Sequence, residues 1–205
     1  MTYAEILNGV NVAFGKKVRK VVKKSYEKTI DVQFGIYEDG RLSISLKPSH
    51  GIKDWLINFM AWGKMHYGYR VEFNVYGGDI LSTIYGSKEL WEASRRGTII
   101  AGRSKGGAEA IMLGMLMTKY SFQDYKNVIV VAIEPPRAFG KKQSKAIDIP
   151  CVSICYKNDI VPSLPIWYHH AGEFIQLGER KLGLSIKDHE RATTDYDLIR
   201  VWFEE

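Results

Sequence analysis

Hydrophobic positions along the chain repeat in two ways, one typical of buried strands and the other typical of helices. Apolar runs at residues 98–101, 127–133 and 150–156 each have the length and composition of a buried strand. Residues 107–117 carry alanine, leucine, methionine and isoleucine at helical spacing, without proline. Strands that alternate with helices predict an α/β domain with a mostly parallel central sheet flanked by helices.

The N-terminal part predicts a helical segment that packs on this sheet. Thr2 can cap a first helix, and Val18, Val21 and Val22 lie at helical spacing within the basic stretch that follows. We therefore expect residues 1–29 to be helical.

An antiparallel hairpin is predicted next. Residues 31–37 alternate between apolar and polar, Asp39-Gly40 is a hairpin turn signal, and residues 41–46 supply the partner strand. One further helix is predicted over residues 79–93, before the strand at 98–101.

The composition fits one soluble globular domain over residues 1–205, with 45% hydrophobic and 25% charged residues. No apolar run approaches the ~20 residues that span a bilayer. At the N-terminus the basic cluster follows the apolar residues, which is the reverse of a secretory signal. We therefore expect a cytoplasmic protein.

The chain is basic, with a net charge of +6, and six lysines and arginines lie between Lys16 and Lys24. Such a cluster could make peripheral contact with an anionic membrane. Nucleic acid is not expected as a partner, because no recognition motif or interleaved aromatic residues accompany the charge. The sequence carries no indication of the oligomeric state.

The two cysteines, Cys151 and Cys155, lie on one face of the same predicted strand. Four residues of strand separate their α-carbons by about 13 Å, which is too far for a disulfide. We expect both to be small buried residues. Cysteines and histidines do not combine into a metal-binding motif.

A serine stands at the apex of a sharp turn between a predicted strand and a predicted helix. Gly102-Arg103-Ser104-Lys105-Gly106 fits G-x-S-x-G, directly after the strand at 98–101 and before the helical run. This order is typical of a nucleophile elbow, in which strained backbone exposes a serine hydroxyl. Side chains at Gly102 and Gly106 would collide with neighbouring backbone, which explains both glycines. A glycine-rich turn with an incidental serine is the alternative interpretation.

A serine nucleophile needs a base and an acid, and in this kind of fold the acid precedes the histidine along the chain. Asp159 directly follows a predicted parallel strand, so it is expected at the same sheet edge as Ser104. Among the downstream histidines we favour His189, in a polar loop over residues 185–190 that can reach across the site. His170 stays open as the alternative base.

Acyl transfer also needs hydrogen-bond donors for the oxyanion that develops on the substrate. One candidate is the backbone N–H of Lys105, at the start of the helix after the nucleophile. The second is expected in the loop of residues 47–50, where Ser49 offers an N–H and a hydroxyl.

Several segments together resemble the class 3 lipases, fungal-type serine esterases with the α/β-hydrolase fold. The elbow is similar to that family's Gly-His-Ser-Leu-Gly-Gly segment, and residues 158–165 are similar to its Asn-Asp-x-Val-Pro-x-Leu-Pro motif. Asp188-His189 resembles its late Asp-His pair. Further likenesses lie at residues 46–49, 54–56, 66–69, 136–140 and 170–173.

The resemblance covers roughly residues 31–196 and implies the α/β-hydrolase fold. It implies Ser104 as nucleophile, Asp159 as acid, His189 as base, and Ser49 with the Lys105 N–H as the oxyanion hole. A metal or an organic cofactor is not implied.

Four features depart from the family pattern. Arg103 replaces the usual histidine of the elbow, and Lys105 replaces an apolar residue. Pro48 replaces a glycine in the oxyanion loop, where it removes an N–H and fixes φ. Residues 56–65 leave room only for a short turn, so we expect a minimal lid.

The sequence therefore predicts a carboxylic-ester hydrolase of the lipase or esterase type, with a Ser-His-Asp triad, an acyl-enzyme, and a small-molecule ester or lipid as substrate. A lipase-like protein of little activity that binds a lipid or protein partner is one alternative, suggested by Pro48, Arg103 and Lys105. A phospholipase at anionic membrane surfaces, recruited by the Lys16–Lys24 cluster, is another.

Overall fold

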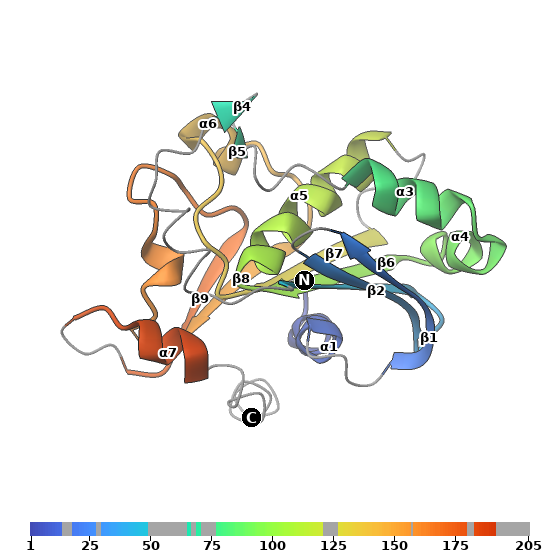
Figure 1. The fold of residues 1–205 in the computed structure, drawn as a ribbon, viewed down its shortest axis with the longest axis horizontal. Helices are drawn as coiled ribbons and strands as arrows, with labels where there is room; N and C mark the ends of the chain where they lie inside the picture. The colour runs from blue at the N-terminus through green and yellow to red at the C-terminus, as the bar shows by residue number, and fades with distance from the viewer. Residues whose placement is uncertain are drawn as a thin grey trace.

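The computed structural model describes residues 1–13, 18–27, 30–48, 65–66, 69–70, 77–120, 127–156, 158–179 and 183–191. A seven-stranded sheet forms its centre, in the order β1-β2-β3-β6-β7-β8-β9 (Figure 1). Its strands are β1 (Val18–Glu27), β2 (Ile30–Tyr37), β3 (Leu42–Pro48), β6 (Thr98–Arg103), β7 (Val128–Ile133), β8 (Cys151–Tyr156) and β9 (Glu173–Leu177).

The sheet combines two modes of pairing. β1, β2 and β3 pair antiparallel, and the chain turns between β2 and β3 at Gly40, which has φ of 87°. From β3 to β9 every neighbouring pair is parallel. The α/β-hydrolase architecture with an antiparallel N-terminal hairpin is therefore confirmed.

The N-terminal segment differs from the prediction in one respect. Helix α1 (Tyr3–Ala13) forms as expected, but the basic stretch after it is the edge strand β1 and not a helix. The pairing of β1 with β2 shifts register twice, between Val18 and Lys20 and between Val21 and Lys23. Bulges of this kind break the two-residue alternation of a strand, so the valines fall at spacings that resemble a helix. Lysines also suit an edge strand, because charge discourages pairing with another chain.

The lysine and arginine side chains of β1 lie outside the described part of the chain. Peripheral contact with an anionic membrane through this cluster therefore stays a prediction. No helix in the described ranges is long and apolar enough to cross a membrane.

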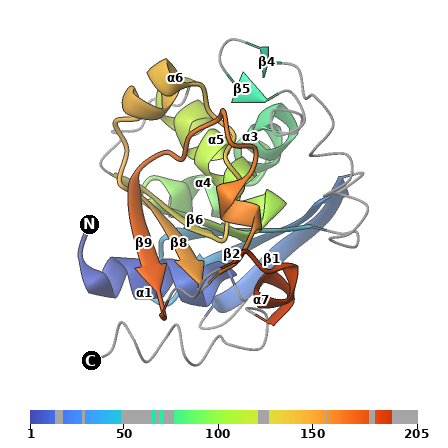
Figure 2. The ribbon, with the colours of Figure 1, turned by 90° about the vertical axis from the view of Figure 1, so that its left-hand side faces the viewer.

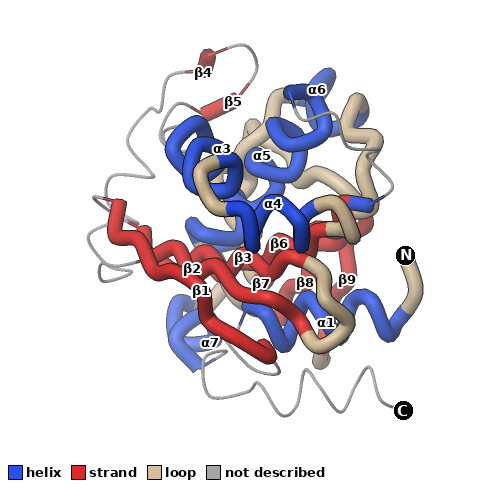
Figure 3. The backbone as a smooth tube through the Cα atoms, turned by 90° about the vertical axis from the view of Figure 1, so that its right-hand side faces the viewer, coloured by secondary structure: helices blue, strands red, loops and turns tan. Residues whose placement is uncertain are grey.

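Helices cover both faces of the sheet (Figures 1 and 3). α1 packs on one face against β6 and β7, with Ile6 and Val10 buried. The opposite face carries α3 (Gly77–Tyr85), α4 (Lys88–Ser94) and α5 (Lys105–Tyr120). The remaining described elements are β4 (Met65–His66), β5 (Tyr69–Arg70), α6 (Lys141–Lys145), the short 3₁₀ helix η3 (Val161–Ser163) and α7 (Ile186–Arg191).

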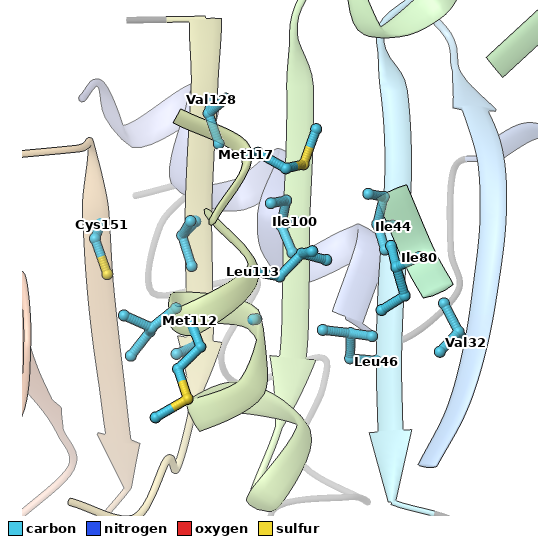
Figure 4. Packing of buried hydrophobic residues seen from close by; sticks show 14 of the residues in the cluster. Val32, Ile44, Leu46, Ile80, Ile100, Met112, Leu113, Met117, Val128 and Cys151 are labelled. Atoms are coloured by element: carbon cyan, nitrogen blue, oxygen red, sulfur yellow. The ribbon is translucent and has the colours of Figure 1, made fainter. Parts of the chain in front are cut away.

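The core on the α5 face is continuous from β2 to β8. Leu113 of α5 lies over Ile100 of β6, and Ile80 of α3 lies beside Ile44 of β3 (Figure 4). This packing fixes α5 on β6, which leads into the elbow, and on β7 beside it. Burial of such side chains stabilises the fold by about 1.5–3 kcal/mol each.

The helix predicted over residues 79–93 is two helices. The first ends at Tyr85, and Ser87 begins the second by accepting a hydrogen bond from the backbone N–H of Leu90 at 3.4 Å. A serine followed by a charged turn is a helix start signal, and it ends the continuous helical pattern here. Both cysteines are buried and free, as expected.

Candidate active site

Ser104 lies at the turn between β6 and α5, as the elbow pattern predicts. Its φ is 55°, a left-handed conformation that is uncommon for a residue with a side chain. The flanking glycines make this turn possible, because a Cβ at Gly102 would lie 2.2 Å from the carbonyl oxygen of Gly106. A Cβ at Gly106 would lie 2.2 Å from the carbonyl oxygen of Leu46. The elbow is therefore packed backbone against backbone, and the end of β3 lies directly beside it.

Asp159 follows β8 at the carboxyl edge of the sheet, where the sequence predicted it. Its backbone N–H donates to the carbonyl of Tyr156 at 3.1 Å, and its Oδ1 accepts from the N–H of Val161 at 2.9 Å. These two bonds fix the side chain and leave Oδ2 directed at His189. The carboxylate is thus oriented by its own turn.

His189 is in helix α7, and not in a polar loop as predicted. Ser185 begins the helix, because its Oγ accepts from the N–H of Asp188 at 3.3 Å. Ser185 also forms a parallel bridge with Asp159, and its N–H donates to the carbonyl of Asn158 at 2.7 Å. The helix that carries the histidine is therefore attached to the turn that carries the aspartate (Figure 2).

The three side chains form one row of hydrogen bonds. Nε2 of His189 lies 2.9 Å from Oγ of Ser104, and Nδ1 lies 2.5 Å from Oδ2 of Asp159. A carboxylate only accepts, so the proton of a neutral imidazole is on Nδ1 and Nε2 is left to accept the serine proton. His189 is fully buried, and Ser104 and Asp159 are 1% and 5% exposed, so water does not compete with these bonds.

The structure brings His189, and not His170, to the serine. Nε2 of His170 lies 2.6 Å from the carbonyl oxygen of Pro162, so it is the protonated nitrogen of that ring. The ring centroid lies 5.0 Å from that of Phe174. Burial lowers the pKa of His170 to about 4, so the ring is neutral near pH 7. His170 therefore fastens η3 to the segment before β9.

Of the two candidate donors to the oxyanion, Lys105 lies within the described residues and Ser49 does not. Lys105 is the first residue of α5, which places its backbone N–H at the positive end of the helix dipole and next to Ser104. Ser49 lies outside the described residues, as do residues 56–64 of the predicted lid region, residues 56–65. β3 ends at Pro48, two residues beyond the Leu46 carbonyl that lies against the elbow.

A buried ion pair lies beside Ser104. Nζ of Lys105 is 3.3 Å from Oε1 of Glu109, one turn along α5. Burial raises the pKa of Glu109 to about 7, and the Lys105 ammonium opposes that rise. The lysine charge that departs from the family pattern is thus partly neutralised within its own helix.

Sequence reasoning missed a second pair, Arg103 and Glu134. Glu134 directly follows β7 and is fully buried, with Oε2 3.3 Å from Nε of Arg103 and 3.5 Å from Nδ1 of His189. Arg103 also donates from Nη2 to the backbone carbonyl of His189. The sequence signal for Glu134 was its place directly after a predicted parallel strand, the same kind of signal that identified Asp159.

Donor atoms of Glu134, Asp159 and His189 lie within 4.8 Å of one another, a spacing that a metal ion also uses. In this structure the same atoms contact one another and Arg103. Nδ1 of His189 bonds to Asp159, and the guanidinium of Arg103 provides the positive charge that faces Glu134. These contacts account for the charges of all three residues within the described part of the chain.

Comparison with known proteins points to the same fold. The lipase of Rhizopus microsporus var. chinensis superposes with a TM-score of 0.72 at 17% identity, over 91% of this chain and 83% of that chain. The triacylglyceride lipase of Rhizomucor miehei gives 0.71 at 15% identity, over 91% and 90%. A further triacylglycerol lipase gives 0.68 at 15% identity, over 86% and 78%. A comparison with curated protein sequences finds no match.

The family model described as lipase (class 3) matches residues 43–169, which is more than half of the chain. This range begins in β3, includes the elbow and Asp159, and ends just before His170. Together with the shared architecture, the match shows that the chain belongs to the class 3 lipase family.

Proposed function

We propose that this protein is a serine hydrolase that cleaves carboxylic esters of the lipid type through an acyl-enzyme. The observation that carries the proposal is the buried row of hydrogen bonds from Ser104 through His189 to Asp159. The triacylglycerol lipase in the comparison has a catalytic centre described as a serine protease triad, which agrees with such a row. Family membership supports an ester or lipid as the substrate class.

In the first half-reaction, Oγ of Ser104 attacks the ester carbonyl carbon while Nε2 of His189 takes the hydroxyl proton. Asp159 holds the tautomer with the proton on Nδ1 and stabilises the imidazolium that forms. The C–O bond to the alcohol then breaks, and the alcohol leaves with the proton from Nε2. The products of this half are an acyl-serine and a free alcohol.

In the second half-reaction, water attacks the acyl carbon and gives its proton to Nε2. Collapse of the tetrahedral intermediate releases the carboxylic acid and returns the proton to Ser104. In both halves the backbone N–H of Lys105 donates to the oxyanion, and Ser49 supplies the second donor. Removal of one such donor typically lowers kcat by about 10²–10³.

A set of p-nitrophenyl esters from acetate to palmitate tests the proposal with purified wild type, Ser104→Ala and His189→Ala. We expect wild type to turn over and both variants to lose at least about 10³-fold in kcat/KM. A fluorophosphonate probe is expected to label wild type and not Ser104→Ala. Retained turnover in Ser104→Ala would exclude this serine as the nucleophile.

The same experiment separates hydrolase from binding protein. A wild type that neither turns over esters nor reacts with the probe would favour the lipase-like binder suggested by Pro48, Arg103 and Lys105. The chain-length profile then distinguishes an esterase from a lipase, since a longer apolar pocket favours longer acyl chains.

A further inference from the structure

Glu134 occupies a position that the serine-histidine-aspartate row does not require. It is fully buried at the end of β7, and Oε2 faces Nδ1 of His189 at 3.5 Å, on the same nitrogen that Asp159 contacts at 2.5 Å. One imidazole N–H therefore has two carboxylates in front of it. Two acids on one base are more than the proton transfer from serine needs.

The backbone holds Glu134 in this place at a cost. Its φ is 50°, so it shares the left-handed conformation of Ser104, and its N–H donates to the carbonyl of Ile154 at 2.7 Å. A non-glycine residue in that conformation is strained and persists only where its surroundings fix it. Strain of this kind is typical of functional positions.

Arg103 supplies the charge that makes a buried Glu134 tolerable. β6 and β7 pair so that Arg103 lies opposite Ile133, which brings its guanidinium to within 3.3 Å of the Glu134 carboxylate. The same guanidinium donates to the backbone carbonyl of His189. Arg103 therefore connects the elbow, the end of β7 and the helix that carries the base.

We propose that Glu134 is a second acid of the triad, a positioning residue that shares the Nδ1 proton of His189 with Asp159 and stabilises the imidazolium once its own carboxyl is ionised. The inference rests on the proposed serine hydrolase. Arg103, whose departure from the family pattern is otherwise unexplained, is the counter-charge that this second acid needs.

Charge counting shows why the ionised form favours catalysis. With Glu134 and Asp159 negative and Arg103 positive, protonation of His189 in the transition state brings the four groups to neutrality. With Glu134 protonated, Asp159 is the one anion that faces Nδ1 and the Arg103 charge is no longer balanced on that side of the ring, which disfavours a second positive charge there. Ionisation of Glu134 therefore raises kcat/KM.

The groups that face Glu134 come from three elements: Arg103 from β6, Asp159 after β8 and His189 from α7. Burial and the Asp159 carboxylate raise the pKa of Glu134 well above its usual value, against the opposing effect of Arg103. Ionisation of Glu134 is thus delayed to higher pH than for an ordinary carboxyl, so the acid limb of activity is expected to report it.

The test compares the pH profile of kcat/KM for wild type and Glu134→Gln, an isostere that cannot ionise. We expect the ratio of wild type to variant to rise with pH and to level off at about tenfold or more once Glu134 is ionised. A purely structural loss would lower activity by the same factor at every pH. A flat ratio would therefore overturn the proposal.

Three variants complete the design. Glu134→Asp keeps an ionisable group and is expected to restore part of the pH-dependent ratio. Arg103→Gln removes the counter-charge and is expected to move the acid limb to higher pH, which supplies a second readout if Glu134→Gln does not fold. An acid limb that does not move in Arg103→Gln would also count against the proposal. Glu92→Gln, whose side chain is 62% exposed on α4, is the control for loss of one negative charge.

A second comparison isolates the shared proton. In Asp159→Asn, Glu134 is the carboxylate left facing Nδ1, so adding Glu134→Gln is expected to cost at least about a further tenfold. Equal activity of the single and double variants would contradict a shared proton. Ser104→Ala, measured alongside, separates the two ideas: if it stays active, the serine mechanism itself is wrong, and if it is inactive while the ratios are flat, only the second acid is wrong.

Discussion

Lys105 and Glu109 face one another one turn apart on α5, with Nζ 3.3 Å from Oε1 and 8% of each side chain exposed. The pair begins at the residue after Ser104, so its protonation state sets the charge beside that serine. Because burial raises the pKa of Glu109 to about 7, that charge changes near neutral pH.

Glu109 makes the stability of the fold depend on pH. The folded protein keeps the Glu109 proton up to about pH 7, whereas an unfolded glutamate releases it near 4.5. Between these values the folded state binds more protons, so the free energy of unfolding falls as pH rises, by at most about 3 kcal/mol. In Glu109→Gln we expect a shallower fall over that window, measured by chemical denaturation from pH 4.5 to 7.5. An unchanged slope, equal to that of Glu92→Gln, would contradict this.

The contact between Gly106 and the Leu46 carbonyl predicts a large effect of one methyl group. In Gly106→Ala the new Cβ would meet that oxygen at 2.2 Å, so the elbow or the end of β3 must move. We expect a loss of more than about 2 kcal/mol in the free energy of unfolding. Gly78→Ala is the matched control, because nothing lies within 4 Å of its Cβ. Equal thermal stability of the two variants would show that the elbow is not tightly packed.

The N-cap of α7 connects helix stability to activity. Ser185→Ala removes the bond from the Asp188 N–H, which typically costs about 1 kcal/mol. Because α7 carries His189, we expect lower kcat/KM and faster amide exchange in α7. Ser87→Ala removes the equivalent cap of α4, away from the site, and is expected to lose similar stability with unchanged activity. Equal activities of the two variants would show that the N-cap of α7 does not influence catalysis.

His170 predicts a loss of stability in acid. Its folded pKa of about 4 lies below the unfolded value of 6.5, so its contribution is complete above pH 6.5 and is lost as pH falls towards 4. In His170→Gln the unfolding free energy is expected to fall less steeply over that range. His169→Gln, which alters an exposed neighbour, provides the comparison. If the free energy of unfolding of His170→Gln depends on pH as it does in wild type, His170 is not the source of the acid instability.

The elbow and the position of Asp159 could be predicted because both depend on short-range signals. Gly102 and Gly106 mark a turn that no larger residue fits, and the geometry around them confirms that reason. Asp159 was found from its place after a parallel strand. Chain order then limited the base to a few histidines. All of these are local patterns combined with one topological rule.

Other features depend on contacts between distant segments and could not be predicted from one stretch. β1 is a strand because the free edge of β2 pairs with it, and its bulges hide the strand period. Arg103 and Glu134 meet because β6 and β7 pair in one register, which places Arg103 beside Ile133. Arg103 alone had the appearance of a departure from the family pattern, and only the sheet register joins it to Glu134.

The bond from Arg103 to the His189 carbonyl has a consequence for exchanging parts between relatives. A family-type elbow with histidine at position 103, grafted into this chain, would leave the buried Glu134 carboxylate without its counter-charge. It would also remove the hydrogen bond from Arg103 to the backbone carbonyl of His189 in α7. The elbow and the residue after β7 therefore form one transferable module, and a chimera that divides them is expected to lose activity although it retains all three members of the triad.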